Sequence, residues 1–368
     1  MLGRVSASRA IDLHGFEATL TVERALVGSE VPGAVVHVAW EELARGASDR
    51  LHDGTRVLLA LDPLPTQSLW QNRFPAGGVR VISGQGAGVI RAPDESTVAA
   101  LDRFLTLSPE ARTDKAGVAA LVELLVVAPP SLALAAVECL AELPELELHV
   151  SASVASALSE VAASPERPLA VREAVFELAA QQQLMALRPA VEAAARSGPP
   201  LEVAGWQALA ALDGRVQPAD LVALLESEQP ALRVLGVRHA RDTPSEPRVA
   251  AAINGDPAPE VRAAAVHAWC AWHGTAGAKV AEPALFDPEP AVRGAAAESL
   301  GGLGEALVPR LEELANEHEG SAAAGPLWAL SHAGAAGRLA LRRIAVGHPD
   351  DRVRKLAAVI SGKPLLDH

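Results

Sequence analysis

Few residues in this sequence could carry chemistry, and their spacing matches no known catalytic or metal-binding motif. The two cysteines, Cys139 and Cys270, form no CxxC pair and therefore indicate neither a disulfide framework nor a zinc site. Of the 11 histidines, His239, His267 and His273 come nearest to a ligand pattern, but their spacing is more typical of surface or core groups. No serine, histidine and aspartate form a recognisable nucleophile motif. We therefore predict no catalytic residues, no bound metal and no cofactor.

A glycine-rich segment over residues 83–88 (SGQGAG) has a composition that could cradle a phosphate. It lies between two short predicted strands, opens no helix and is followed by no GK[ST] signature. A hairpin or bulge is therefore the favoured interpretation, with anion binding as the alternative.

Composition and charge argue against several classes of protein. The chain has 368 residues, of which 49% are hydrophobic and 3% aromatic, so its core must be built from Ala, Leu and Val. The 32 basic and 45 acidic residues give a net charge of −13, which argues against a nucleic-acid binder, because phosphate binding needs a basic face. No apolar run is long enough to span a membrane and no signal peptide is visible, so a cytoplasmic protein is the default. An exported or periplasmic protein is the alternative if a signal peptide is missing from this sequence.

The first 92 residues have the period-2 pattern of β-strands. Residues 16–23 and 36–40 alternate apolar and polar side chains, and residues 56–61 form an apolar run typical of a strand buried on both faces. Strands at this spacing predict a small β-barrel or sandwich over residues 1–92, followed by a connecting helix over 93–108. The long loop over 62–78 carries Trp70 and Phe74, which either anchor a partner or cover the open end of the barrel.

From residue 109 the apolar period becomes helical and the sequence repeats itself. The segment 256–266, DPAPEVRAAAV, aligns with 287–297, DPEPAVRGAAA, and places Arg262 and Arg293 31 residues apart. In both directions the same slot recurs, at residues 172, 202, 233, 262, 293, 323 and 354. A period near 30 residues with two helical stretches per copy predicts an α-α superhelical solenoid of seven to eight repeats over residues 109–365.

The motif D-P-x-P-x-V-R-x-A-A-A resembles the HEAT repeat, in particular the short HEAT-like repeat of phycobilin lyases. The resemblance implies structural roles for the motif residues. The prolines fix the turn, the aspartate caps the following helix, and the arginine reaches the capping aspartate of a neighbouring repeat. The residues assigned to this ladder are Arg172, Arg233, Asp256, Arg262, Asp287, Arg293 and Arg354.

Some proteins built from HEAT-like repeats are enzymes, so the resemblance leaves an enzymatic alternative open. A deoxyhypusine hydroxylase would hold two irons with recurring His-Glu pairs, whereas His318-Glu319 occurs in a single repeat. A phycobilin lyase would need acidic and aromatic residues around a bilin, for which Glu177, Trp206 and Trp328 are available, without a lyase-specific signature. A DNA glycosylase would need a basic concave face, which an acidic array does not offer. The alternative is therefore a bilin- or metal-dependent enzyme, lyase-like or hydroxylase-like.

The N-terminal part is similar, more weakly, to netrin-like, OB-related barrels. The similarity rests on the runs FEATLTVERALVG, AVVHVAW, LHDGTRVLLAL and GVRVISGQGAGVI, and the cysteine pairs of the extracellular members are absent. The resemblance implies export, because such modules in bacteria are usually exported. The scarcity of Lys relative to Arg is typical of a GC-rich bacterial genome. A structural component of a bacterial envelope assembly is therefore a second alternative.

A helical wheel that starts at the motif valine predicts which side chains a partner would meet. It places positions +3, +4, +7, +8 and +11 in the core and +2, +5, +6 and +9 outside, on the helices that line the concave groove of a HEAT array. Trp328 is either a binding hot spot or packs against Leu327 and the last repeats. We predict a non-enzymatic scaffold that binds a protein or peptide in this groove. The residues assigned to the groove are Glu177, Gln207, Arg238, Arg241, His267, Glu298 and Trp328.

Overall fold

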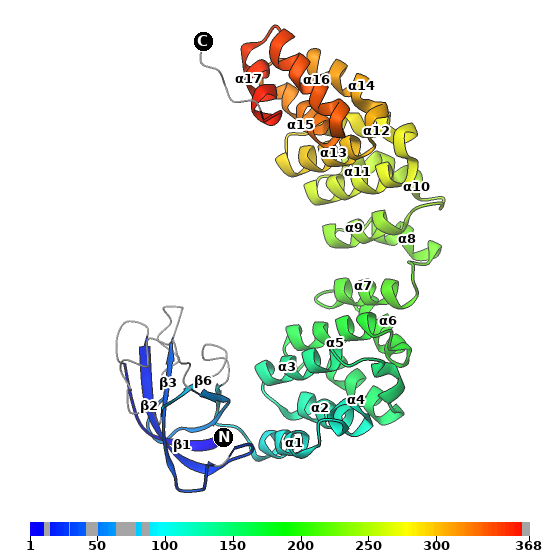
Figure 1. The fold of residues 1–368 in the computed structure, drawn as a ribbon. Coiled ribbons are helices and arrows are strands. Elements are labelled where there is room, and N and C mark those ends of the chain that lie inside the picture. Colours follow the sequence, from blue (N-terminus) through cyan, green and yellow to red (C-terminus); the bar gives the residue numbers. More distant parts are fainter. Residues whose placement is uncertain (11–14, 29, 42–50, 64–78, 83–88, 363–368) are drawn as a thin grey trace. The chain divides into compact units, whose positions relative to one another are not determined.

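The computed structural model describes the chain except for residues 11–14, 29, 42–50, 64–78, 83–88 and 363–368 (Figure 1). The chain divides into two compact units, Met1–Ala208 and Leu209–His368, here called the N-terminal unit and the C-terminal unit. A β-sheet followed by helices makes up the first, and helices alone make up the second. In the part of the chain that is described, no helix combines the length and apolar character needed to cross a membrane.

The N-terminal unit begins with seven strands in one sheet. Their spatial order is β5-β6-β3-β2-β1-β4-β7, and all recorded pairs are antiparallel except the parallel pair β3–β6. The strands are β1 (Leu2–Ala10), β2 (Gly15–Arg24), β3 (Val35–Glu41), β4 (Arg56–Leu59), β5 (Leu61–Pro63), β6 (Val79–Ile82) and β7 (Val89–Arg91).

The alternation in the sequence sorts the side chains of the sheet between its two faces, as predicted. Phe16, Leu20 and Val38 lie on the face that forms the core of the sheet, and the Phe16 and Trp40 rings stack across β2 and β3 with centroids 5.6 Å apart. In β4 both faces are buried, because Leu58 joins a second cluster on the opposite face of the sheet.

The strand-rich domain predicted for residues 1–92 is present, but its sheet is open, so the barrel alternative of that prediction is wrong. The hydrogen-bonded ladder ends at β5 and β7, which have three residues each, and these two strands do not pair with one another within the described residues. The sheet is nevertheless strongly curled, because Ala60 alone separates β4 from β5 although these strands lie near opposite ends of the ladder. Curling lets a single sheet bury one face without a second layer.

Helix α1 (Glu95–Thr106) covers the outer face of the sheet. Its side chain Val98 is buried with Leu58 of β4, and the helix begins where the Asp94 carboxylate accepts a hydrogen bond from the Thr97 backbone amide at 2.6 Å. An ion pair between Arg24 and Asp102, 2.5 Å apart, ties β2 to the same helix. A small apolar cluster and this ion pair therefore hold α1 against the sheet.

The remaining helices of the N-terminal unit pack in two layers. Helices α2 and α4 contact one another in one layer, and α3 and α5 do so in the other. Buried leucines such as Leu125, Leu140 and Leu158 fill the space between the layers. The bounds are α2 (Lys115–Val127), α3 (Pro130–Ala141), α4 (Ala152–Ala163), α5 (Leu169–Gln181), α6 (Arg188–Ala195) and α7 (Glu202–Leu212), which ends beyond the boundary between the units.

The C-terminal unit is built from repeated helix pairs. The helices that carry the repeat motif, here called the motif helices, are α9, α11, α13, α15 and α17, and they lie side by side in one layer (Figure 1). The bounds are α8 (Pro218–Leu225), α9 (Pro230–His239), α10 (Glu246–Gly255), α11 (Pro259–His273), α12 (Ala278–Ala281), α13 (Pro290–Gly302), α14 (Val308–Asn316), α15 (Ala324–His332), α16 (Gly334–Gly347) and α17 (Asp351–Ile360).

Two motif arginines reach the aspartate of the next repeat. Arg233 donates to both carboxylate oxygens of Asp256 at 2.8 Å, and Arg262 donates to both oxygens of Asp287 at 2.7 and 2.9 Å. Each arginine also donates to a carbonyl in the turn before its own helix, Ser227 O and Asp256 O respectively, at 2.8 Å. The arginine therefore joins its own turn to the next turn along the array.

The other three motif arginines differ from the expected ladder. Arg172 donates to the Ala162 carbonyl, Arg293 to the Asp287 carbonyl, and Arg354 to the His348 carbonyl. For Arg293 the reason is visible in the sequence, since the residue 31 positions after Asp287 is His318 and not a carboxylate.

The ladder predicts that the free energy of unfolding depends on Arg262 far more than on Arg293. Arg262→Ala leaves the Asp287 carboxylate, whose side chain is 8% exposed, without its partner, and we expect a loss of about 3 kcal/mol. Arg293→Ala removes hydrogen bonds to carbonyls alone, and we expect a loss of about 1 kcal/mol. Urea unfolding followed by circular dichroism measures both. Equal losses would contradict the ladder.

The ladder also predicts an acid-sensitive array. The hydrogen bonds from Arg262 hold the pKa of Asp287 below its ordinary value, against the opposing effect of burial. A carboxylate with a depressed pKa in the fold stabilises it above the unfolded pKa of about 4, and that stabilisation is lost as the pH falls through the folded pKa. We expect the urea midpoint to fall on acidification below about pH 4, and to fall less steeply in Asp287→Asn. An identical pH dependence in that variant would contradict this role.

Candidate functional site

One position of the motif helices faces outward in every repeat. This is position +6 from the motif valine slot. On the motif helices of the C-terminal unit it is occupied by Arg238, His267, Glu298 and Trp328, and on the equivalent helices α5 and α7 it is occupied by Glu177 and Gln207. All six side chains are exposed. The four in the C-terminal unit come from the neighbouring helices α9, α11, α13 and α15, and they are called the exposed row below.

Of the other positions predicted to face outward, +5 is buried and +9 is buried in part, since Arg241 at +9 is exposed. Position +5 is buried in Phe176, Trp206, Val237, Val266, Ala297 and Leu327, and position +9 is buried in Ala210, Cys270 and Gly301. The prediction failed because a wheel drawn for one helix ignores its neighbours. Each motif helix packs against another motif helix as well as against the second layer, so its buried arc is wider than that of an ordinary amphipathic helix.

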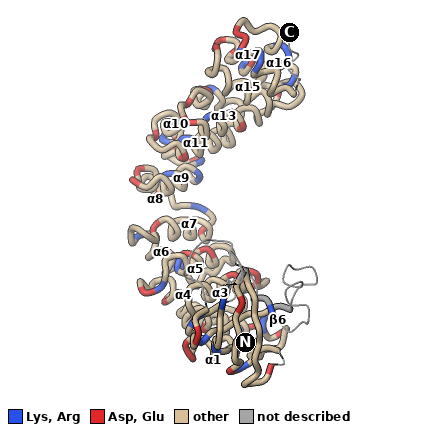
Figure 2. The backbone as a smooth tube through the Cα atoms, turned by 90° about the vertical axis from the view of Figure 1, so that its left-hand side faces the viewer, with Lys and Arg blue, Asp and Glu red and all other residues tan. Residues whose placement is uncertain are grey.

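A polar contact links one member of the exposed row to an adjacent helix. The His267 ring nitrogen Nδ1 lies 2.7 Å from the Ser299 hydroxyl, which joins α11 to α13 beside Glu298. Arg241 lies just beyond the end of α9, with its guanidinium 3.5 Å from Asp242. Basic and acidic residues are interspersed along the unit (Figure 2). The row therefore carries charges of both signs.

Trp328 supplies the largest apolar side chain of the row. Its side chain is 51% exposed, although its neighbour Leu327 is fully buried in the core of the C-terminal unit. The Ser331 hydroxyl donates to the Trp328 carbonyl at 2.6 Å, which involves the backbone of Trp328 and leaves the indole outside. The indole is thus available to a partner.

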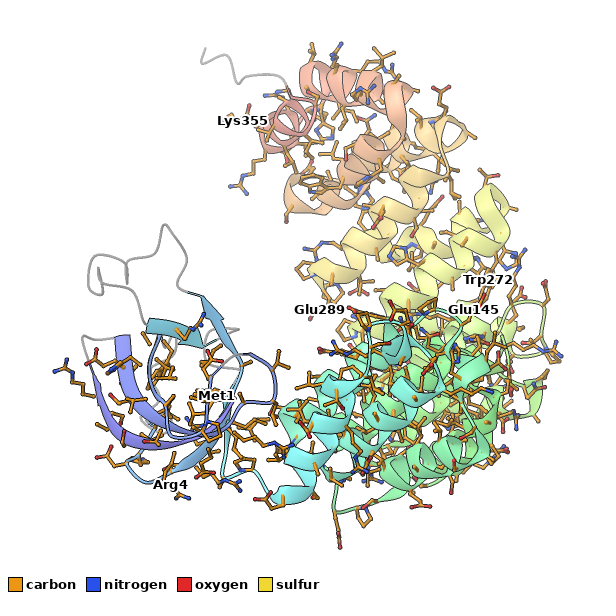
Figure 3. All side chains as sticks on the ribbon, turned by 60° about the horizontal axis from the view of Figure 1, so that its bottom comes forward. Met1, Arg4, Glu145, Trp272, Glu289 and Lys355 are labelled. Carbon is orange, nitrogen blue, oxygen red and sulfur yellow. The ribbon has the colours of Figure 1, made fainter. Side chains whose placement is uncertain are left out.

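Sequence reasoning missed Val359, which extends the exposed row by one repeat. It lies six residues after Val353 on α17 and is 58% exposed. Applying the same +6 offset to the last copy of the motif, the one that contains Arg354, would have found it. Lys355, on the same helix, pairs with Asp351 at 2.8 Å (Figure 3). With Val359 included, the row has Arg238 at one end and two apolar side chains at the other.

The residues considered for enzymatic chemistry lie in unremarkable surroundings. Trp206 is 7% exposed beneath the Arg196 guanidinium, and His318 stacks on Phe286 with its Nδ1 2.8 Å from the Leu314 carbonyl. Burial raises the pKa of the Cys270 thiol to about 11. Within the described ranges, no three His, Cys, Asp or Glu side chains are placed to hold a metal ion. Trp70, Phe74 and the glycine-rich segment 83–88 lie outside the described residues.

We predict that Trp328 contributes little to the free energy of unfolding. Trp328→Ala removes a half-exposed ring, and we expect a loss below about 1 kcal/mol. Leu327→Ala, its matched control in the core, creates a cavity and should cost about 3 kcal/mol. Urea unfolding measures both losses and shows whether the Trp328 indole packs in the fold or is free to bind a partner. A loss for Trp328→Ala as large as that for Leu327→Ala would show that the indole packs in the fold.

The comparisons with known proteins bear on the same part of the chain. No curated protein matches the sequence at a significant level. A family model described as HEAT repeats matches residues 245–331, which run from α10 to α15 and include His267, Glu298 and Trp328. The helical body around this segment is consistent with a HEAT-like solenoid. Residues 245–331 are thus HEAT repeats, set within a chain of stacked helix pairs that follows an N-terminal sheet.

Proposed function

We propose that the chain is a non-enzymatic interaction scaffold, and that a protein or peptide binds to the exposed row of the C-terminal unit. The observation that carries the proposal is that Trp328 is half-exposed, although its neighbour Leu327 is fully buried in the core. An exposed tryptophan is typical of an interface hot spot, because tryptophan, tyrosine and arginine side chains supply most of the binding energy at protein interfaces.

The chemistry of the row indicates what kind of partner fits it. Trp328 and Val359 lie on neighbouring motif helices and offer apolar surface to an apolar side chain. Arg238 and Arg241, at the other end of the row, suit an acidic group. The partner is therefore an extended or helical segment with an apolar residue toward one end and a carboxylate toward the other. The match of the HEAT-repeat family supports this proposal, because stacked repeats present extended surfaces of this kind to partners.

Small residues on the motif helices favour such an occupant. Position +2 is occupied by Ala263, Gly294 and Ala324 on three successive motif helices. Because these side chains are short, the longer side chains of the row extend further from the helix surface. A bound segment can therefore contact the row closely.

The proposal predicts the outcome of an affinity purification from the native cells, read by quantitative mass spectrometry. The variant Arg238→Ala/Glu298→Ala/Trp328→Ala should lose its partner by at least about tenfold, because it removes the hot spot and both charges. The fold should be retained, since all three side chains are exposed.

A matched control changes the same number of exposed residues away from the row. Glu305→Ala/Arg342→Ala/Val346→Ala removes an acid, a base and an apolar side chain from the segment before α14 and from α16. This control should retain the partner. Equal enrichment of the partner by the row variant and by the wild type would contradict the assignment of the exposed row as the binding surface.

A further inference from the structure

The N-terminal unit contains a cavity that the exposed row does not involve. It has a volume of about 690 Å³ and lies between the outer face of the sheet, helix α1 and helix α3. Met1 marks its sheet side (Figure 3). Volumes of roughly 300–1,000 Å³ are typical of small-molecule sites. Nothing in the proposed scaffold function requires this cavity.

The walls of the cavity are apolar and come from elements far apart in the sequence. Leu58 and Ile90 of the sheet form one wall, Leu101 of α1 forms another, and Leu132 of α3 faces them. Leu58 is buried, whereas the other three side chains are only partly buried. Apolar side chains that converge from three elements without filling the space between them form a site for an apolar ligand.

The charged groups among these apolar walls are the Arg80–Glu30 pair and the Met1 α-ammonium, which donates a hydrogen bond to the Leu59 carbonyl at 2.8 Å. The Arg80 guanidinium lies 3.3 Å from the Glu30 carboxylate, a separation longer than the 2.7–2.9 Å of a strong charge-assisted hydrogen bond. Glu30 is the one side-chain partner that the described part of the structure gives Arg80. The arginine is thus held near the cavity by a weak contact that a better acceptor can replace.

A glycine places the carboxylate beside the cavity. Gly28 has a φ of +111°, and a Cβ at this position would lie 2.5 Å from the Glu30 carboxylate oxygen. The absence of a side chain therefore lets Glu30 lie back against the chain near Arg80. Glu30 and Arg80 are both in the cavity lining.

We propose that this cavity binds a fatty acid. The acyl chain lies against Leu58, Leu101 and Leu132, and the carboxylate accepts hydrogen bonds from Arg80 in place of Glu30. The apolar walls account for the chain, and the Arg80 guanidinium accounts for the anionic head, while the Met1 α-ammonium remains near the Glu30 carboxylate. A neutral apolar molecule and an empty cavity are the competing outcomes of the test.

The first test measures binding of saturated fatty acids to the full chain, by displacement of the fluorescent probe cis-parinaric acid. The probe should bind saturably at one site. Because each buried CH₂ adds about 0.8 kcal/mol, each two-carbon extension from C8 should tighten binding about tenfold until the cavity is full. Failure of the probe to bind saturably, or an affinity independent of chain length, would overturn the proposal.

The second test fills the cavity. Ser131→Phe places a ring into the space from an exposed position on α3, and Ala135→Leu places a branched aliphatic side chain there one turn further along the same helix. Each should weaken palmitate binding at least about tenfold. Ser156→Phe, an exposed serine on α4 that does not line the cavity, is the matched control and should bind as the wild type does. Unchanged binding by both filling variants would place the fatty acid elsewhere.

The third test separates the head from the chain. Arg80→Gln should weaken palmitate about tenfold, because a charged hydrogen bond is lost. The same variant should change binding of hexadecanol, the neutral analogue, less than about twofold. Equal effects on the two ligands would show that Arg80 does not recognise the carboxylate and would overturn the assignment to a fatty acid. Circular dichroism confirms that each variant is folded.

Discussion

A pair of short helices cannot bury its own apolar surface, and every repeat of this protein depends on its neighbours for cover. In the C-terminal unit, neighbouring helix pairs cover one another's apolar surface because their backbones approach closely. A Cβ added to Gly301 of α13 would lie 2.2 Å from the Ala329 carbonyl of α15, and one added to Gly325 would lie 2.0 Å from the Leu285 carbonyl. The glycines let α15 lie against α13 and against the turn before it. The buried Arg–Asp pairs then join one turn to the next, at Arg233 and Arg262.

This packing also decides which side chains a partner can reach. A motif helix between two others buries positions +4 and +5 fully and positions +8 and +9 in part, and it leaves +6 in solvent. The fold therefore places little demand on position +6, which holds an arginine, a histidine, a glutamate and a tryptophan on successive helices. The core sets the spacing of the row, and the residues of the row set its chemistry. This division of roles lets HEAT-like arrays of similar fold present different surfaces.

Much of the fold could be predicted because it follows from local periods. The alternation over residues 16–23 placed Phe16 and Leu20 in the core of the sheet, and the recurring motif located the helices that carry Arg262 and Arg293. That the sheet stays open could not be predicted, since this depends on the lengths of β5 and β7 and on the non-local pair β3–β6. Burial at +5 also escaped prediction, because it depends on a second helix that the wheel omits.

The candidate sites also include one that the sequence could predict and one that it could not. Exposure of Trp328 followed from the repeat register, and one more step along that register leads to Val359. The cavity of the N-terminal unit has no counterpart in the sequence pattern, because Arg80, Leu101 and Leu132 meet only through tertiary packing. The missing carboxylate partner of Arg293 was predictable from the sequence, although we did not predict it. The residue one repeat beyond Asp287 is His318, so a reading that checked both ends of each pair would have anticipated it.

The central claim is that the exposed row is a protein-binding surface, and site-specific photo-crosslinking in native cells tests it most directly. The photoreactive amino acid p-benzoylphenylalanine is introduced at position 328 or at position 346 on α16, where Val346 is also exposed. The account predicts a discrete adduct from position 328 and none of the same mass from position 346. The same adducts from both positions, or none from position 328, would contradict it.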